Sequence, residues 1–339
     1  MKHTTKKLAA LLLAALLVLG LAACGETTET VAENPPETSS EPSNTAIPVV
    51  GISQYGEHPS LDNCREGFLQ GLAEAGLVEG TDYTVNYQNA GFDDNIAMQI
   101  GQNFSANNVA LMCAIATPSA TACYAAAEDK NIPVVFTAIT DPAAAGLTAG
   151  GATGTSDKLP VEAQLELIRA LQPEAEKIGI LYTVSEPNSV SAIAEYKEKA
   201  PDFGFEIVDI GVTAQSEVTQ ATDRILTKDV DCLSNLTDNN VVGVLASVLE
   251  KTDAAGIPVY GSEVEQVKIG CVAAAGIDYV ALGRQTGAMA AKILRGEATA
   301  DEIPFETISE YGIYVNSSAL ARMNLTLPED LAGRAVEAE

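Results

Sequence analysis

The hydrophobic and polar positions alternate between two periods from residue 47 onward. Short runs rich in valine and isoleucine, such as "IPVVGIS", "VALMCAIA" and "IPVVFTAI", are separated by segments with an apolar residue at every third or fourth position, such as "LDNCREGFLQGLAEAG". The first pattern predicts buried β-strands and the second predicts amphipathic helices. Their regular alternation indicates βαβ units, in which successive strands form a parallel sheet.

The same order of elements occurs twice. The segment "KIGILYTVSEPNSVSAIAEYKEKA" parallels the start of the first set, and "EPNS" (186–189) occupies the place of "EHPS" (57–60). Later in the chain, "VDCLSNLTDNN" and "GIPVYGSE" parallel "VALMCAIATPSAT" and "IPVVFTAI". Two aligned blocks in the same order predict two similar α/β lobes, of which the second begins near Leu159.

The remaining C-terminal segment predicts one helix, Val280–Leu294, and one or two strands. It is too short for a third domain, so we expect it to return to the first lobe and then complete the second. The first lobe would then comprise residues 47–158 with about 280–303, and the second 159–279 with about 304–325. The predicted fold is α/β, with two Rossmann-like lobes of parallel sheet joined by a hinge that the chain crosses three times.

The N-terminal segment has a different pattern. Lysines at positions 2, 6 and 7 precede an apolar run and then "LAAC" (21–24), and the first acidic residue is Glu26. This order is typical of a secretory signal, and the run is shorter than the ~20 residues that span a bilayer. "LAAC" resembles a bacterial lipobox, which implies removal of residues 1–23 and lipidation of Cys24; an ordinary cleaved signal or an uncleaved anchor is the alternative. Residues 24–46, mostly Glu, Thr, Ser and Pro, predict a disordered tether.

The chain is strongly acidic, with 19 Lys+Arg against 46 Asp+Glu and a net charge of −27. Loss of residues 1–23 removes three lysines and brings the net charge to about −30. Such a protein repels nucleic acid and anionic lipid. We therefore expect no nucleic-acid partner, and a lipid rather than surface charge as the membrane anchor.

Five cysteines follow Cys24, at positions 64, 113, 123, 232 and 271. An odd number without a C-x-x-C pair argues against a zinc site and against a full disulfide framework. We interpret them as small core residues and leave a Cys113–Cys123 pair open.

Motifs for catalysis and cofactor binding are absent from the sequence. It contains no G-x-S-x-G, and "GLTAGGATGTSD" has neither the Gly-Lys-Ser/Thr of a P-loop nor the spacing of a dinucleotide fingerprint. His58 is the only histidine after the signal, and only Glu57 and Asp62 lie near it as further metal ligands. We predict no enzymatic activity, no cofactor and no metal.

Polar residues instead follow strand after strand. In open α/β sheets the carboxyl ends of the strands line the ligand crevice. The candidate ligand-binding residues at these ends are Ser53, His58, Thr117, Ser119, Thr137, Asp141, Asn188, Asp238 and Glu263.

"TPS" (117–119) is the most informative of these turns. Threonine suits a helix N-cap, proline suits the first helical position, and the free amide groups there attract an anion, although simple capping explains the same residues. Asp238 is the first candidate to meet a ligand ammonium group, with Glu263 and Asp141 as alternates; capping or closing a turn is the alternative role. We interpret His58 as a cleft-rim or hydrogen-bonding residue, with helix capping as the alternative.

The segments "GISQYGEHPSLDNCREGF", "AIATPSATA", "FTAITDPAAAGL", "NLTDNNVV", "GIPVYGSE" and "AAGIDYVALGRQTGAMAAKIL" resemble the ABC-transporter substrate-binding lipoproteins whose best-known members take tryptophan and related aromatic amino acids. The resemblance extends from about Ile47 to Leu325. It implies a type I periplasmic-binding-protein fold, in which a ligand is enclosed as the two lobes close. The chain has no tryptophan and only 5% aromatic residues, so an aromatic cage must come from a few residues such as Tyr55, Phe136, Tyr182 or Tyr260.

We therefore predict a monomeric, extracytoplasmic protein, anchored by a lipid on Cys24, that delivers a small zwitterionic ligand, an amino acid, to an ABC permease. A ligand sensor for a membrane receptor would share the fold and the pocket. A surface hydrolase would need an activated nucleophile or a carboxylate pair in the cleft.

Overall fold

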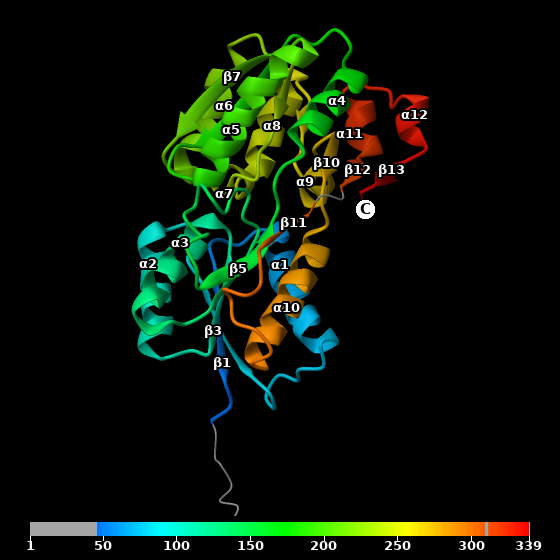
Figure 1. Ribbon diagram of the computed structural model, residues 1–339. Helices are drawn as coiled ribbons and strands as arrows, with labels where there is room; N and C mark the ends of the chain where they lie inside the picture. The colour runs from blue at the N-terminus through cyan, green and yellow to red at the C-terminus, as the bar shows by residue number, and fades with distance from the viewer. Residues whose placement is uncertain (1–45, 309–310, 339) are drawn as a thin grey trace, which may run out of the picture. The chain divides into compact units, whose positions relative to one another are not determined.

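The structure is a computed structural model, which describes residues 46–308 and 311–338. It confirms an α/β fold of two lobes with parallel sheets (Figure 1). Within the described ranges, no helix has the length and apolar character needed to span a membrane. The predicted signal peptide, Cys24 and the predicted tether up to residue 45 lie outside the described residues.

The first lobe contains one six-stranded sheet in the order β11-β5-β4-β3-β1-β2, with every pair parallel. Its strands are β1 (Val49–Gln54), β2 (Thr84–Asn89), β3 (Leu111–Ile115), β4 (Val134–Thr137), β5 (Ala152–Ser156) and β11 (Glu306–Thr307). Its helices are α1 (Pro59–Glu74), α2 (Asp94–Ala106), α3 (Thr117–Ala127), the short 3-10 helix η1 (Glu128–Lys130) and α10 (Tyr279–Leu294). The central strands β3 and β4 are buried along their whole length, which explains their continuous apolar sequence.

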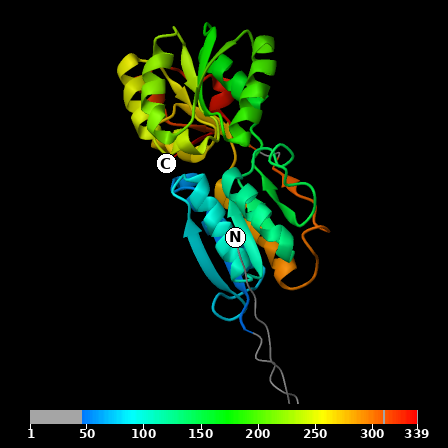
Figure 2. The same cartoon turned by 90° about the vertical axis from the view of Figure 1, so that its left-hand side faces the viewer.

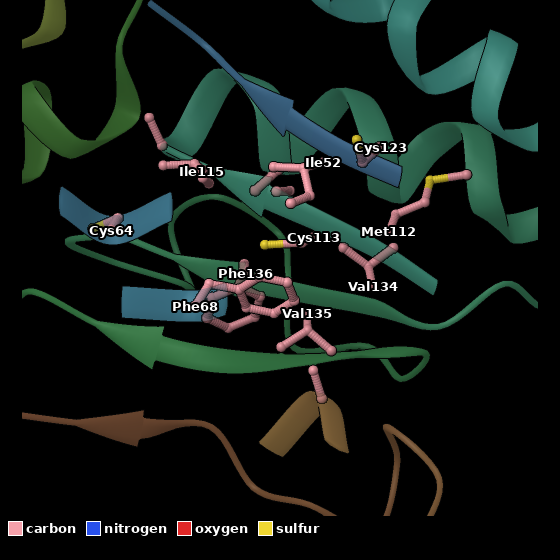
Figure 3. Close-up of a cluster of buried hydrophobic side chains, with 14 of the residues drawn as sticks. Ile52, Cys64, Phe68, Met112, Cys113, Ile115, Cys123, Val134, Val135 and Phe136 are labelled. Atoms are coloured by element: carbon pink, nitrogen blue, oxygen red, sulfur yellow. The ribbon is translucent and has the colours of Figure 1, made fainter. Parts of the chain in front are cut away.

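The core of this lobe lies between the sheet and its helices. Figure 3 shows Cys64, Cys113 and Cys123 among Phe68, Phe136 and other apolar side chains. These three cysteines, together with Cys232 and Cys271, are free and buried. They therefore serve as small core residues in this structure, and Cys113 and Cys123 are not paired.

Helices α1 and α10 pack side by side, although about two hundred residues separate them in the chain (Figure 1). Their contact is made by two pairs of glycines with the same spacing, Gly67 and Gly71 in α1 and Gly283 and Gly287 in α10. A Cβ atom at Gly71 would lie 2.2 Å from the carbonyl oxygen of Arg284. The backbones are thus in direct contact, and only glycine permits this approach.

The second lobe contains the parallel four-stranded sheet β7-β6-β8-β9 and a three-stranded sheet in which β10 pairs antiparallel with β12, and β12 parallel with β13. The strands are β6 (Lys177–Thr183), β7 (Glu206–Val212), β8 (Cys232–Ser234), β9 (Val259–Tyr260), β10 (Ala273–Gly276), β12 (Gly312–Val315) and β13 (Ala335–Glu337). The helices are α4 (Val161–Leu171), α5 (Pro187–Lys199), η2 (Ala200–Phe203), α6 (Gln215–Leu226), α7 (Asn239–Val242), α8 (Leu245–Ala255), α9 (Val264–Ile269), α11 (Ser317–Arg322) and α12 (Glu329–Ala332). Figure 2 shows helices on both sides of the sheet strands in this lobe.

The chain passes between the lobes three times, from β5 to α4, from β10 to α10, and from β11 to β12. Strand β11 pairs with β5, so the first lobe's sheet includes residues just beyond the expected boundary near 303. The complete assignment of residues to lobes stays a prediction. All nine candidate ligand residues lie at or just beyond the carboxyl ends of strands. Ser53 and Thr137 lie within β1 and β4, Thr117, Ser119 and Asn188 lie in the first turn of α3 or α5, and His58, Asp141, Asp238 and Glu263 lie in the turns that follow β1, β4, β8 and β9.

Candidate functional site

Hydrogen bonds between side chains connect the two lobes directly. They are Ser60 Oγ to Glu263 Oε1 at 3.0 Å, Asn63 Nδ2 to Glu265 Oε1 at 2.9 Å, Thr140 Oγ1 with Thr237 Oγ1 at 2.9 Å, and Ser191 Oγ to Asp141 Oδ2 at 2.7 Å. Two of the predicted ligand residues, Asp141 and Glu263, thus contact the opposite lobe.

A small polar cavity of about 20 Å³ lies between the lobes. Its lining includes His58, Ser60 and Asp157 together with Thr237, Glu263 and Tyr279. A cavity of this size holds one water molecule or two. A larger ligand can occupy this place only when the lobes or their side chains move apart.

A much larger depression, about 810 Å³, lies along α2 and α3. It is lined mainly by small and apolar residues such as Met98, Pro118 and Ala125, and none of the nine predicted ligand residues lines it. We place the candidate site in the small cavity and its surroundings, because buried polar groups from both lobes converge there.

The start of α3 leaves polar groups available. The N-cap position belongs to Ala116, and Thr117 is the first helical residue, with no side-chain cap hydrogen bond. Its hydroxyl is buried and has no hydrogen-bond partner among the described residues. Simple capping therefore does not explain Thr117. Nearby, Ser53 Oγ donates to Ser119 Oγ at 3.2 Å.

The backbone is strained at the ends of two adjacent strands. Ala116 after β3 has φ +77°, and Ala138 after β4 has φ +58°. Non-glycine residues adopt such angles at a cost, and they collect at functional sites. Ala138 lines the small cavity, and Ala116 directly precedes Thr117 at the start of α3.

His58 occupies the N-cap position of α1, but its side chain makes no capping hydrogen bond. Helix capping by the imidazole is therefore wrong for this residue. His58 as a residue is 9% exposed. Burial lowers the pKa of His58 to about 4, while the Asn239 side chain and the charge of Asp62 act in the opposite direction. The imidazole is neutral at neutral pH.

Phe92, which the sequence analysis missed, completes an aromatic group beside His58. Its ring is parallel to the imidazole within 10°, with centroids 6.4 Å apart, and stands edge-on to Tyr55 at 5.9 Å. A Cβ atom on Gly243 of the second lobe would lie 3.0 Å from Phe92 Cζ. The only sequence signal was an aromatic residue in the turn after β2, in "NAGFDD".

The other aromatic candidates lie elsewhere. Phe136 and Tyr260 are completely buried in the cores of the first and second lobes, and the Tyr260 hydroxyl donates to Gln172 Oε1 at 3.0 Å. Tyr182 is partly buried in β6. Of the four, only Tyr55 lies next to the His58–Phe92 pair.

Asp238 and Glu186 form a buried pair of carboxylates in the second lobe. Asp238 accepts hydrogen bonds from Thr183 N (2.5 Å), Thr183 Oγ1 (2.8 Å), Ser189 Oγ (2.7 Å) and Val241 N (2.9 Å). Glu186 accepts from Asn188 Nδ2 (3.0 Å), Asn239 N (3.2 Å), Asn239 Nδ2 (2.7 Å) and Asn240 Nδ2 (3.2 Å). Burial raises the pKa of both groups, and the charge of Asp238 raises that of Glu186 further. Sequence reasoning treated Glu186 only as part of the repeat.

Two more buried carboxylates line the cavity itself. Asp157 accepts from the Tyr279 hydroxyl at 2.5 Å and from Thr140 Oγ1 at 3.0 Å. Glu263, the N-cap of α9, accepts from two backbone amides of that helix and from Ser60 of the first lobe. Burial raises the pKa of Glu263 to about 7 and raises that of Asp157.

No lysine or arginine among residues 46–308 and 311–338 forms an ion pair with any of these four carboxylates. All the hydrogen bonds that they accept come from neutral N–H and O–H groups. A buried carboxylate without a counter-ion is costly to ionise, which is why the pKa values of these groups are raised, and a ligand that brings a positive charge would stabilise their ionised form.

The remaining predicted residues have defined places. Thr137, at the end of β4, contacts Cys64 Sγ at 3.8 Å and accepts from Thr155 Oγ1 at 3.2 Å, within the first lobe. Asn188 donates to Glu186 and to the carbonyl of Thr237, while its Oδ1 has no partner among the described residues. The ligand-binding roles of the nine residues stay predictions. Among residues 46–308 and 311–338, no cluster of three metal-ligating side chains occurs.

The protein has two α/β lobes, and the chain passes between them three times. Buried polar and charged groups from both lobes meet at their interface. This arrangement defines a two-lobed binding protein that encloses a small molecule. The chain belongs to the ABC transporter substrate binding protein family, whose family model matches residues 49–339. Proteins of this family are extracytoplasmic and bind solutes.

The similar proteins include a tyrosine-binding protein of Clostridioides difficile, which is 37% identical over 282 residues, 81% of each chain. A substrate-binding domain from Streptococcus pneumonia in complex with L-Trp is 30% identical, with a TM-score of 0.82 over 86% of this chain and 99% of that one. The ligand-free, open structure of a substrate binding protein with adhesive properties from Clostridium difficile is 35% identical, with a TM-score of 0.64 over 86% and 100%. The backbone thus resembles the L-Trp complex more than the open structure.

Proposed function

We propose that this protein is a lipid-anchored component of an ABC importer that binds an aromatic amino acid between its lobes and presents it to the permease. Closure of the lobes around the ligand is the functional event, because the ligand stabilises the closed state by contacts with both lobes. No chemical step on the ligand is involved.

The proposal rests on one observation above all. The Thr117 hydroxyl at the start of α3 has no partner among the described residues and can donate a hydrogen bond to an anion. The second lobe holds three buried carboxylates that make no ion pair with a described lysine or arginine, Glu186, Asp238 and Glu263. A zwitterionic amino acid carries a carboxylate, which suits the Thr117 hydroxyl, and an ammonium group, which suits the buried carboxylates. Burying either charge unpaired costs several kcal/mol. With Thr117 on the first lobe and three of the four buried carboxylates on the second, both poles of the ligand are bound only when the lobes are closed around it.

Two further facts support an aromatic side chain on that ligand. Phe92, His58 and Tyr55 form an aromatic group at the lobe interface. Among similar proteins, one with 37% identity is a tyrosine-binding protein, and one with 30% identity was crystallised with L-Trp. Isothermal titration with the three aromatic amino acids tests the function, and the absence of binding by all three contradicts it.

Replacing Thr117 with valine is expected to leave the stability of the free protein unchanged or slightly higher. The hydroxyl has no hydrogen-bond partner among residues 46–308 and 311–338 that the change would remove, and valine preserves the shape of the side chain. Ligand affinity is expected to fall by about 1–2 kcal/mol, because the ligand carboxylate loses a hydrogen bond. Thermal melting of the free protein and calorimetric titration measure the two effects.

Thr153→Val is the matched control for Thr117→Val. Thr153 lies in β5, is fully buried, and its hydroxyl likewise has no partner among the described residues. The Thr153→Val variant is expected to bind the ligand with unchanged affinity. Equal losses of affinity in both variants would show that Thr117 does not contact the ligand.

Cys24→Ala is expected to abolish lipid attachment while the binding domain still folds. The reason is that "LAAC" provides the only cysteine at the end of an apolar signal, and the thioether bond to the lipid needs its sulfur. Metabolic labelling with a radioactive fatty acid, followed by fractionation of membranes, measures the outcome. Label on the Cys24→Ala protein would contradict a lipid on this residue.

A further inference from the structure

We propose that His58 selects ligands by the hydrogen-bonding group on their aromatic ring, and favours those that carry an O–H or N–H donor over those that carry none. This inference rests on the proposed function, since it concerns the side chain of the same aromatic ligand. It assigns to His58 the role of a specificity-determining residue.

The first observation is that His58 has unused hydrogen-bonding capacity. Both ring nitrogens are buried, and neither makes a hydrogen bond of normal geometry with the described residues, although the Asn239 side chain lies close enough to act on the pKa of the ring. Buried polar atoms without partners are rare in native proteins, and each costs free energy unless a ligand or a solvent molecule satisfies it. No capping role uses the side chain either.

The second observation is where the ring lies. His58 lines the cavity between the lobes, and the parallel ring of Phe92 lies beside it with centroids 6.4 Å apart. The two carboxylates of the cavity, Asp157 and Glu263, come from other elements, β5's end and the start of α9. His58 lies on the same cavity as the two carboxylates but comes from a different element. In the proposed complex the ligand's ammonium group meets the carboxylates, and its ring lies against His58 and Phe92.

The chemistry of a neutral imidazole then determines the preference. Burial holds the pKa of His58 at about 4, so one nitrogen carries a proton and the other is an acceptor at neutral pH. The acceptor nitrogen pairs with a phenol O–H or an indole N–H. A phenyl ring offers no such donor and leaves the buried imidazole unsatisfied. The ligand carboxylate does not compete for this nitrogen, because a carboxylate only accepts hydrogen bonds.

A site built for a polar group rejects the analogue that lacks it more strongly than an apolar pocket separates two apolar groups. Loss of one such hydrogen bond in a buried site corresponds to roughly a 10- to 100-fold change in affinity. We expect the intact protein to bind L-tyrosine or L-tryptophan tighter than L-phenylalanine by this factor.

The test is calorimetric titration of the intact protein, His58→Leu and His58→Gln with L-tyrosine, L-tryptophan, L-phenylalanine and 4-fluoro-L-phenylalanine. The fluorine analogue fills the space near the para position of the ring without donating a hydrogen bond. His58→Leu is expected to bind all four within about 3-fold of one another, whereas His58→Gln, which keeps a donor and an acceptor, retains part of the preference. Glu57→Gln, an exposed neighbour, is the control and keeps the full preference.

The ratio of affinities separates recognition from structural support, because a general loosening of the site weakens all four ligands alike. Equal affinity of the intact protein for L-tyrosine, L-tryptophan and L-phenylalanine would overturn the inference while leaving the proposed function intact. An undiminished preference in folded His58→Leu, checked by near-UV circular dichroism, would overturn it too. Failure of every aromatic amino acid to bind the intact protein would contradict the proposed function itself.

Discussion

Replacing Asp238 with alanine is expected to lower the free energy of unfolding of the free protein by about 3–5 kcal/mol, among the largest single effects in the molecule. Asp238 is fully buried and accepts hydrogen bonds from Thr183, Ser189 and Val241. These donors belong to the end of β6, to α5 and to α7, so one carboxylate holds three elements together. Alanine leaves the buried donors without partners, and partial relief of repulsion with Glu186 offsets only part of the loss.

A residue that served the ligand alone could be removed without cost to the free protein. The four hydrogen bonds of Asp238 predict that its loss destabilises the free protein. They are compatible with a second role of Asp238 in binding the ligand. Ligand affinity is expected to fall as well, by about 2–5 kcal/mol, the range for loss of one partner of a buried charge pair. Asp238→Asn, which still caps α7 but carries no charge, allows the affinity to be measured on a folded protein.

Urea unfolding of Asp238→Ala and of Asp278→Ala gives the comparison. Asp278 is also an N-cap and accepts from Val280 N and Ala281 N at the start of α10, but it is exposed. Its removal is expected to cost about 1 kcal/mol. A cost for Asp238→Ala no greater than that of Asp278→Ala would show that the buried network contributes nothing beyond an ordinary cap.

Gly283→Ala in α10 is expected to destabilise the first lobe by about 2–3 kcal/mol, although alanine is the better helix former. A Cβ atom at this position would lie 2.3 Å from the carbonyl oxygen of Cys64 and 2.8 Å from the amide nitrogen of Phe68, both in α1. Neither backbone group can rotate away as a side chain would, so α1 and α10 must separate. Separation exposes Leu72, Leu282 and their apolar neighbours in the core of the lobe.

Gly333→Ala is the matched control for Gly283→Ala. Gly333 follows α12 with φ −73°, and a Cβ atom there would meet nothing within 4 Å. Its replacement is expected to be neutral. Urea unfolding measures both variants, and amide hydrogen exchange locates the loosened elements. Unchanged stability and unchanged protection of α1 in Gly283→Ala would mean that the two helices are not held in backbone contact.

The proposed specificity of the site depends on residues that come together only in three dimensions. Phe92 follows β2 and His58 precedes α1, and nothing in the spacing of these two residues along the chain indicates that their rings are parallel. Glu186 looked like a repeat of Glu57, yet Glu186 is buried beside Asp238 and Glu57 is exposed. Homologous positions in the two halves thus have opposite environments, since only one of them is covered by asparagine side chains from α7.

The sequence by itself determined the two α/β lobes and the positions of the polar turns, because the period of apolar residues and the residues that begin helices are local properties. It also indicated that the cysteines are core residues and that a helix near residues 280–294 returns late in the chain. The tertiary structure alone decided which of the polar side chains use their hydrogen-bonding groups, as Asp238 does, and which find no partner in the part of the chain that the structure describes, as His58 and Thr117 do. That distinction depends on distances between residues far apart in the chain, which are set by packing such as the glycine contact of α1 with α10, and no local pattern contains them.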